Sequence, residues 1–299
     1  MKLSNKEKNI AIFGATGHIA KNLIYYFSKN TEHKLFLFSR NKIKLQNFVS
    51  SITADKNIVY DYYENIPSQS FDIIINCIGI SNPSDVSKYD YDILTLTERY
   101  DEIIIEYLKK NDSCLFLNFS SGVVYGDFSQ PANDEFLPDL FLDDFSRDAY
   151  SLAKINSENK HRALPFLNII DIRIFSFFSR FIDLNTSFFI SELITFFRDF
   201  IHPYDLYHLI SLCIKHSESN FVLDAYSTSP ISKYDILEEF SNHYDLKYSF
   251  KSDLKIEHPT GFKEKYYSLS KKAKNIDYNP IYSSLETILG ESHFLIFIL

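Results

Sequence analysis

The first 175 residues alternate short apolar runs with longer amphipathic stretches. Strands that alternate with helices predict a parallel sheet, and runs that are apolar on both faces are typical of strands buried beneath helices. We expect strands at residues 9–13, 34–39, 57–63, 72–79, 114–120 and 168–175. We expect helices near residues 18–30, 41–51, 89–110 and 148–163. The fold class predicted is therefore α/β, a Rossmann doubly wound parallel sheet.

After residue 175 the alternation weakens, which predicts a smaller mixed α/β C-terminal substrate region. Helices are expected at residues 187–200 and 204–217, a strand at 220–226, and a helix over 232–244 that Ser232 opens. We expect residues 1–175, together with about 199–226, to form the Rossmann domain. The substrate-binding region then comprises about 176–198 and 227–299. No repeat or long linker separates the two parts, so they should pack closely.

Composition excludes several classes of protein. The chain has 299 residues, a net charge of -8 and no dense block of Lys and Arg, which argues against nucleic acid and anionic membranes as partners. No window reaches the ~18 apolar residues that a membrane span needs. The three cysteines are far apart and the histidines lack metal-ligand spacing, so we expect no disulfide framework, no metal and a cytoplasmic location.

A glycine turn follows the first expected strand, in the sequence FGATGHIA. Gly14 allows a sharp turn into the helix, Gly17 allows the backbone to approach a pyrophosphate, and Ala20 lets the helix pack on the sheet. The backbone from Thr16 through His18 and Ile19 then presents free N–H groups to phosphates. The chain has only seven glycines, so this placement favours dinucleotide binding. The alternative is a tight turn without a ligand.

Two further positions concern the cofactor. Ser39, Arg40 and Lys42 follow the second expected strand, where an NAD-binding protein would carry an acid for the ribose 2′-hydroxyl. Their charge favours NADP(H) over NAD(H), although a solvated loop would have the same composition. Gly79 ends the fourth expected strand, where a missing side chain would let the cofactor ribose approach; a plain turn is the alternative.

The pattern Tyr-x-x-x-Lys occurs three times, at Tyr25/Lys29, Tyr150/Lys154 and Tyr267/Lys271. Only Tyr150 begins a helix directly after a strand that ends in serines, at the carboxyl edge where ligands of such sheets bind. One helical turn brings Lys154 beside Tyr150, and an ammonium together with a cationic nicotinamide would stabilise the phenolate. Ser121 would offer a second hydroxyl to the same substrate oxygen.

These motifs together resemble the extended short-chain dehydrogenases/reductases of the NAD-dependent epimerase/dehydratase family, which act on nucleotide sugars. The resemblance is carried by Gly14-x-x-Gly17-x-x-Ala20, SSGVVYG, the Tyr150/Lys154 pair and RDFIHPYD. It implies a catalytic set of Ser121, Tyr150 and Lys154, a nucleotide-sugar partner and a homodimer. It also implies substrate contacts at Ser121, Gly122, Arg180 and Arg198. Arg180 could instead lie at the surface, and Arg198 could join the two regions.

The chain also departs from this family's dehydratases, which usually carry Thr-Asp-Glu where Ser121, Gly122 and Val123 stand here. Dehydration is therefore not expected. The leading hypothesis is an NADPH-dependent reductase of a nucleotide-linked 4-keto sugar, with Tyr150 as the general acid. The alternatives are a nucleotide-sugar epimerase with tightly bound NAD(P), and a non-catalytic NADP(H)-binding protein.

Overall fold

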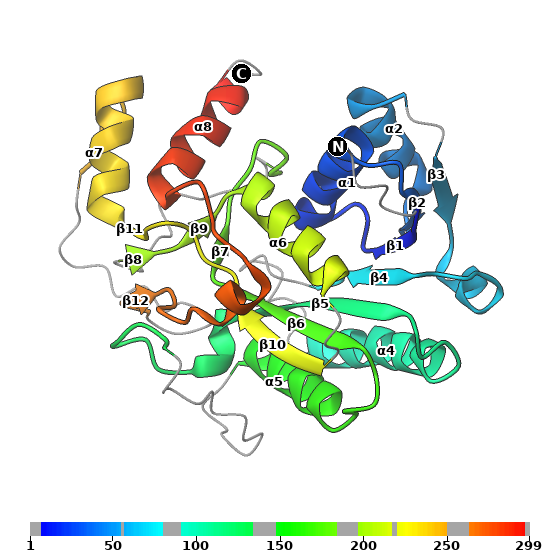
Figure 1. Cartoon of the computed structure of the whole chain (residues 1–299). Coiled ribbons are helices and arrows are strands. Elements are labelled where there is room, and N and C mark those ends of the chain that lie inside the picture. Colours follow the sequence, from blue (N-terminus) through cyan, green and yellow to red (C-terminus); the bar gives the residue numbers. More distant parts are fainter. Residues whose placement is uncertain are drawn as a thin grey trace.

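Seven parallel strands form the main sheet of the computed structural model, which describes residues 7–54, 57–79, 91–133, 148–183, 197–216, 220–249 and 263–296 (Figure 1). The strands are β1 (Asn9–Phe13), β2 (Lys34–Phe38), β3 (Ile58–Asp61), β4 (Ile73–Asn76), β5 (Leu115–Ser121), β6 (Ile169–Ile174) and β10 (Asn220–Asp224). Their order across the sheet is β10-β6-β5-β4-β1-β2-β3, and each neighbouring pair is parallel. This arrangement confirms the predicted Rossmann sheet.

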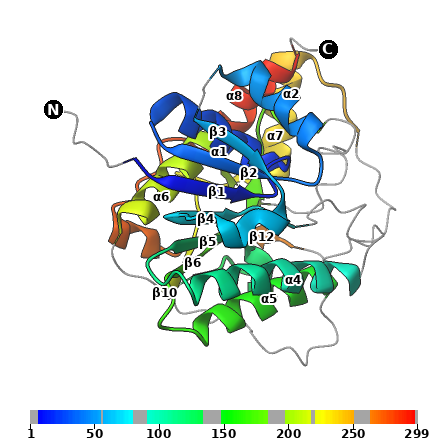
Figure 2. The ribbon, with the colours of Figure 1, turned by 90° about the vertical axis from the view of Figure 1, so that its right-hand side faces the viewer.

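Helices cover both faces of the sheet, as Figure 2 shows. They are α1 (His18–Asn30), α2 (Lys42–Ile52), α4 (Tyr91–Leu108), α5 (Ala149–Arg162) and α6 (Pro203–Lys215). Helices α4 and α5 pack together on one face, and α1 packs with α6 on the other. The apolar strand β1 serves both layers: Ile10 and Ile12 join the core beneath α1, whereas Ala11 and Phe13 join the core beneath α4. Strands that are apolar on both faces are thus buried on both, as expected.

A smaller mixed region lies beyond the carboxyl edge of the sheet (Figure 1). Its elements are β7 (Ser176–Phe177), β8 (Phe197–Arg198), β9 (Phe200–Ile201), β11 (Ile231–Ser232), β12 (Lys265–Tyr266), α7 (Lys233–Tyr244) and α8 (Ser284–Ile296). Strands β11, β8 and β12 form one small sheet, and β7 pairs with β9. Ser232 caps α7 as expected, since its hydroxyl accepts from Asp235 N and the Asp235 carboxylate accepts from Ser232 N.

The helix expected at residues 187–200 is wrong at its carboxyl end. Residues 184–196 lie outside the described residues, but 197–198 form β8 and 200–201 form β9. Strand pairing explains the difference, because β8 lies between β11 and β12 and β9 pairs with β7. A short apolar run does not reveal such distant partners, and its periodicity fits a helix or a strand.

Two expected strands end early because polar side chains turn the chain. Strand β4 stops at Asn76, whose Oδ1 accepts from Ile78 N at 3.0 Å. Strand β3 stops at Asp61, whose Oδ1 accepts from Tyr62 N at 2.8 Å before the short helix η1 (Tyr63–Ser68). Both turns shape the edge of the sheet on which the candidate site lies.

Buried carboxylates join the smaller region to the main sheet. Asp205 of α6 accepts from the backbone N–H groups of Ile281 and Tyr282, and Asp199 accepts from Ser227 N. Burial raises the pKa of both carboxyls, but these hydrogen bonds oppose that increase. The two parts therefore pack closely, as expected. Across the described ranges, no helix is both long and apolar enough to cross a membrane.

Candidate functional site

The turn between β1 and α1 leaves little room for side chains at its two glycines. Gly14 has φ of +69°, and a Cβ there would lie 2.9 Å from the carbonyl carbon and oxygen of Cys77. A Cβ on Gly17 would lie 3.1 Å from Gly14 O. Glycine at both positions therefore lets β1 turn tightly beside β4, and the start of α1 comes to the carboxyl edge of the sheet.

The amino end of α1 has no side-chain cap. Gly17 is its N-cap residue, and its first turn contains no acidic residue. The side chain of His18 is engaged elsewhere, with Nε2 2.7 Å from Ser179 Oγ. Burial, helped by Lys21, lowers the pKa of His18 to about 4, so the ring is neutral. Main-chain groups of Thr16 to Ile19, rather than side-chain charge, are what this turn offers to an anion.

The end of β2 carries a buried hydroxyl without a partner. Ser39 is 1% exposed, and no group among the described residues forms a hydrogen bond with its Oγ. Such a group is costly to bury, so the position fits a polar ligand atom that completes it. Arg40 beside it is exposed, and Lys42 Nζ lies 3.5 Å from the centroid of the Tyr62 ring. The segment 39–42 contains no carboxylate.

Sequence reasoning missed Tyr63, which fastens the glycine turn to β2. Its hydroxyl accepts from Gly14 N at 3.0 Å and donates to Phe38 O at 3.2 Å. Burial raises the pKa of Tyr63 to about 12, so the phenol keeps the proton that it donates. Its ring packs edge-on against Phe13, at 5.5 Å between centroids. No local motif identifies this tyrosine, because its partners lie on two other strands.

The structure brings Ser121, Tyr150 and Lys154 together at the end of β5. Tyr150 and Lys154 lie one turn apart on α5, and Lys154 Nζ is 5.7 Å from the centroid of the Tyr150 ring. Nζ donates to Phe119 O at 2.7 Å, and the Cβ missing at Gly79 would stand 3.8 Å from it. A Cβ at position 79 would therefore stand in ordinary van der Waals contact with the ammonium.

The other two Tyr-x-x-x-Lys pairs lie elsewhere. Tyr25 and Lys29 are on α1, and Tyr25 packs against Tyr26 and Phe181. Lys271 lies 4.1 Å from the centroid of the Tyr226 ring. Position in the fold, and not the motif itself, distinguishes the pair at the end of β5.

Burial dominates the electrostatics of this cluster. It raises the pKa of Tyr150, while a hydrogen bond with Ser121 opposes that increase. It lowers the pKa of Lys154, while the carboxylates of Asp171, Asp101 and Glu158 oppose the decrease. In the protein alone, Tyr150 is a neutral phenol. A phenolate at neutral pH would need the additional positive charge of a bound nicotinamide, as the sequence argument anticipated.

A buried polar chain, also missed from the sequence, runs behind Lys154 across three strands and two helices. Asn76 Nδ2 donates to Asn118 Oδ1 at 3.1 Å, and Asn118 Nδ2 donates to Asp171 Oδ1 at 2.8 Å. His161 then bridges Asp171 and Asp101, with contacts of 2.9 and 2.8 Å. Burial alone would lower the pKa of His161, but the two carboxylates raise it to about 10, so its ring is charged.

A second buried network joins the ends of β5, β6 and β10. Arg173 Nε donates to Glu158 Oε1 at 2.9 Å, and Nη1 donates to Tyr125 Oη at 3.0 Å. Tyr125 in turn donates to Asp224 Oδ2 at 2.9 Å, and Ser268 donates to the same oxygen at 2.6 Å. This network ties α5, which carries Tyr150, to the neighbouring strands and to the segment after β12.

The smaller region contributes side chains to the cluster. Tyr266 of β12 is buried, and its hydroxyl lies 3.1 Å from Ser121 Oγ. Arg198 Cζ and Lys263 Nζ lie 5.7 and 5.3 Å from the centroid of the Tyr266 ring. Burial, reinforced by Arg198, lowers the pKa of Lys263 to about 8. Arg198 thus lies near the cluster, where the sequence placed a substrate contact, whereas Tyr266 and Lys263 were not anticipated.

Arg180 lies apart from this cluster. Its guanidinium donates to Glu291 of α8 through Nε at 2.9 Å and Nη2 at 2.6 Å, and Cζ is 3.3 Å from the centroid of the Phe294 ring. These contacts hold α8 to the segment after β7. Of the two arginines expected near substrate, only Arg198 lies beside Ser121 and its neighbours.

Gly122 begins the short helix η2 (Gly122–Tyr125) and has no room for a side chain. A Cβ there would lie 2.5 Å from the Phe175 ring. Val123 is buried in the apolar cluster that contains Val124 and Phe128. An acidic residue would fit neither position without rearrangement, which is consistent with the expectation that the chain does not dehydrate its substrate.

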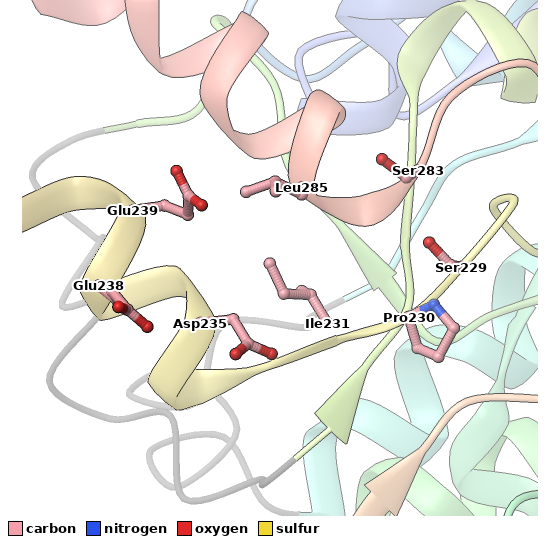
Figure 3. Close-up of a pocket in the computed structure, with 8 residues that line it drawn as sticks. All are labelled: Ser229, Pro230, Ile231, Asp235, Glu238, Glu239, Ser283 and Leu285. Carbon is pink, nitrogen blue, oxygen red and sulfur yellow. The ribbon is translucent and has the colours of Figure 1, made fainter. Parts of the chain in front are cut away.

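A pocket of about 340 Å³ lies between α7 and α8, away from these residues (Figure 3). Its lining includes the carboxylates of Asp235, Glu238 and Glu239, with Ile231 and Leu285 between the helices. Three carboxylates would repel a nucleotide diphosphate. Within the described ranges, no group of His, Cys, Asp and Glu side chains has an arrangement that could hold a metal ion.

Comparisons with known proteins give one family match. A family model described as the NAD dependent epimerase/dehydratase family matches residues 10–227. No curated protein matches the chain in sequence.

Three solved structures illustrate the similarity of the fold. UDP-glucuronic acid 4-epimerase from Bacillus cereus, in complex with UDP-glucuronic acid and NAD, has a TM-score of 0.80 at 16% identity, covering 97% of this chain and 100% of that chain. UDP-glucose-4-epimerase from Stenotrophomonas maltophila, with NAD and formylated UDP-arabinopyranose, has a TM-score of 0.81 at 11% identity, covering 98% and 99%. dTDP-glucose 4,6-dehydratase from Bacillus anthracis str. Ames, in complex with NAD, has a TM-score of 0.74 at 17% identity, covering 97% of each chain.

Proposed function

Since the chain belongs to the NAD dependent epimerase/dehydratase family, we propose that it is a nucleotide-sugar epimerase that works through Ser121, Tyr150 and Lys154. The single observation that carries the proposal is the convergence of these three side chains at the carboxyl end of β5, beside the glycine turn of β1. The similarity in fold to epimerases along nearly the whole chain supports this reaction over reduction.

Each of the three side chains has a role that follows from its chemistry. A bound nicotinamide dinucleotide would accept a hydride from a sugar carbon and return it. In its ionised form, which the charge of a bound nicotinamide would favour, Tyr150 takes the proton from the hydroxyl on that carbon and then gives it back. Ser121 hydrogen-bonds the same oxygen. Lys154, fixed by Phe119 O, keeps positive charge next to Tyr150 and has further N–H groups for the cofactor ribose.

The proposal of a nucleotide-linked sugar is supported by cations around Tyr266. Arg198 and Lys263 both lie near this ring. The chain as a whole has a net charge of -8, so two neighbouring basic side chains stand out from the rest of the protein. Guanidinium and ammonium groups both bind phosphate oxygens, so these two side chains suit a diphosphate. The epimerases of similar fold hold UDP-linked sugars. A homodimer is part of the same proposal.

For the cofactor we propose NADP(H) over NAD(H). The buried Ser39 hydroxyl, the exposed Arg40 and the absence of an acid in the segment 39–42 all suit a ribose 2′-phosphate. Arg40→Ala should weaken NADPH binding about tenfold and leave NADH binding unchanged, as measured by fluorescence titration of the purified protein. Equal affinity for both cofactors, with no effect of Arg40→Ala, would refute this preference.

The preference for NADP(H) and the protonation of Tyr150 favour a second candidate function. NADPH is the usual reductant of biosynthetic reductases, and Tyr150 is already protonated as a general acid in the protein alone. An NADPH-dependent reductase of a nucleotide-linked 4-keto sugar would use the same three side chains, with net consumption of the cofactor.

One experiment separates the two functions. The purified protein is incubated with UDP- and dTDP-linked hexoses, hexuronic acids and 4-keto sugars, and products are followed by NMR and cofactor by absorbance. An epimerase interconverts two sugars without net change in NAD(P)H, whereas a reductase consumes one NADPH for each product. Tyr150→Phe should abolish either reaction, and Tyr267→Phe should leave it intact. Absence of conversion across the whole panel would contradict both.

A further inference from the structure

Tyr266 has no part in the reaction proposed above, yet it is a direct hydrogen-bond partner of Ser121. Its hydroxyl lies 3.1 Å from Ser121 Oγ, and the pair is buried. The residue comes from β12, which lies 145 positions along the chain from Ser121. A hydroxyl brought from another region onto a candidate catalytic serine calls for a role of its own.

The tyrosine is held firmly in this position. Tyr266 pairs with Arg198 across the small sheet, and Lys265 N donates to Phe128 O at 2.9 Å. Its ring packs edge-on against Phe128 and Phe175, at 4.8 and 5.2 Å between centroids. The hydroxyl is therefore placed by backbone pairing and by ring packing, and it does not depend on Ser121 for its position.

The hydrogen bonds of Ser121 can be assigned from its chemistry. A serine hydroxyl donates one proton and accepts two hydrogen bonds. Ser121 Oγ accepts from Val123 N at 3.4 Å. Burial raises the pKa of Tyr266, so its phenol keeps its proton and is able to donate to the second acceptor position of Ser121. Ser121 is then able to donate its own proton in a hydrogen bond toward Tyr150. The hydrogen bond with Ser121 lowers the pKa of Tyr150.

We propose that Tyr266 is a positioning residue, which donates its hydroxyl proton in a hydrogen bond to Ser121 and so directs the Ser121 proton toward Tyr150 and the sugar oxygen that Tyr150 serves. The proposal rests on the proposed function of Ser121 and Tyr150. Because hydrogen bonds in a chain polarise one another, the Tyr266 hydroxyl also makes Ser121 a stronger donor to the charge that develops on that oxygen.

The test is Tyr266→Phe, which keeps the ring packing and removes the hydroxyl. On a sugar that the protein converts, we expect kcat to fall about tenfold with KM changed less than about twofold, as for loss of a hydrogen bond that strengthens in the transition state. In the Ser121→Ala background the same substitution should have no further effect, because the residue through which Tyr266 acts is gone. Tyr267→Phe is the control, since Tyr267 follows β12 directly and is half-exposed.

A second measurement does not need turnover. In protein labelled with ¹³C at the tyrosine ζ-carbons, the Tyr150 signal is assigned by its loss in Tyr150→Phe. The chemical shift of this signal should change in Tyr266→Phe and in Ser121→Ala, and it should not change in Tyr267→Phe. In the double variant Ser121→Ala/Tyr266→Phe it should be the same as in Ser121→Ala alone. If no sugar is converted but these shifts occur, the proposed function fails and the positioning stands. A Tyr150 signal unmoved by Tyr266→Phe, or effects of Tyr266→Phe that persist undiminished without Ser121, would overturn the proposal.

Discussion

At the scale of single residues, the site depends on positions that lack a side chain as much as on the side chains that are present. Gly14 and Gly122 each leave a space that another group fills, the Cys77 carbonyl in one case and the Phe175 ring in the other. Ser39 shows the reverse, a buried hydroxyl for which the described protein supplies no partner. The first two positions explain how the chain forms the site, and the third indicates where a ligand completes it.

Gly14→Ala tests the first of these positions. Its Cβ would meet the Cys77 carbonyl at 2.9 Å, and φ of +69° strains any other residue. We expect the free energy of unfolding to fall by about 2 kcal/mol and cofactor binding to be lost, as measured by urea denaturation and fluorescence titration.

The matched control is Gly290→Ala in α8. No atom lies within 4 Å of a Cβ built there, and the residue is exposed within a helix. This substitution should raise the free energy of unfolding by about 1 kcal/mol, because alanine favours helix more than glycine does. Equal effects of the two substitutions would contradict the account of the glycine turn.

At the scale of elements, α5 is the component on which the site depends most. One face carries Tyr150 and Lys154, and its last turn carries His161 between two buried carboxylates. Asp171 and Asp101 thus stabilise the positive charge of both His161 and Lys154, since both carboxylates also oppose the decrease in the pKa of Lys154. The same two carboxylates therefore hold α5 in place through His161 and stabilise the charge of its lysine.

This arrangement predicts how stability depends on pH. The pKa of His161 rises from 6.5 to about 10 on folding, so the stability that its charge contributes is complete below about pH 6.5 and is lost as pH rises toward 10. The free energy of unfolding should therefore fall between pH 7 and 10. The His161→Gln variant should be destabilised at pH 7 by about 3 kcal/mol, and its free energy of unfolding should change less steeply with pH.

Urea denaturation at several pH values measures both quantities. His243, which is half-exposed on α7, provides the control, because His243→Gln should change neither the stability at pH 7 nor the slope by more than about 0.5 kcal/mol. A slope that His161→Gln leaves unchanged would show that the ring is not charged in the folded protein.

At the scale of the whole molecule, the C-terminal region both closes the fold and supplies part of the site. Arg180 and Arg198 separate these two tasks. Arg180 holds Glu291 of α8, whereas Arg198 lies beside Tyr266 and Lys263. The sequence treated the two arginines alike, and their surroundings in the fold distinguish them.

Substitution of each arginine tests this division. Arg180→Ala should lower the free energy of unfolding by about 3 kcal/mol, because it leaves the buried Glu291 carboxylate without its main partner, and it should leave KM for the nucleotide sugar nearly unchanged. Arg198→Ala should instead raise KM at least tenfold. Denaturation and steady-state kinetics measure these outcomes, and a KM effect of Arg180→Ala as large as that of Arg198→Ala would contradict the assignment.

What the sequence determined by itself is the winding of the main sheet and the place on it where Ser121, Tyr150 and Lys154 come together. Alternation of apolar runs, the glycine turn and the spacing of Tyr150 and Lys154 are local patterns, and local backbone preferences are sufficient to interpret them. The tertiary structure alone decided that residues 197–201 pair as strands, that Asn76, Asn118 and Asp171 form one buried chain, and that Tyr266 meets Ser121. These contacts join segments that are distant in the sequence, and each polar partner is chosen by which groups become buried together, so no local pattern contains them.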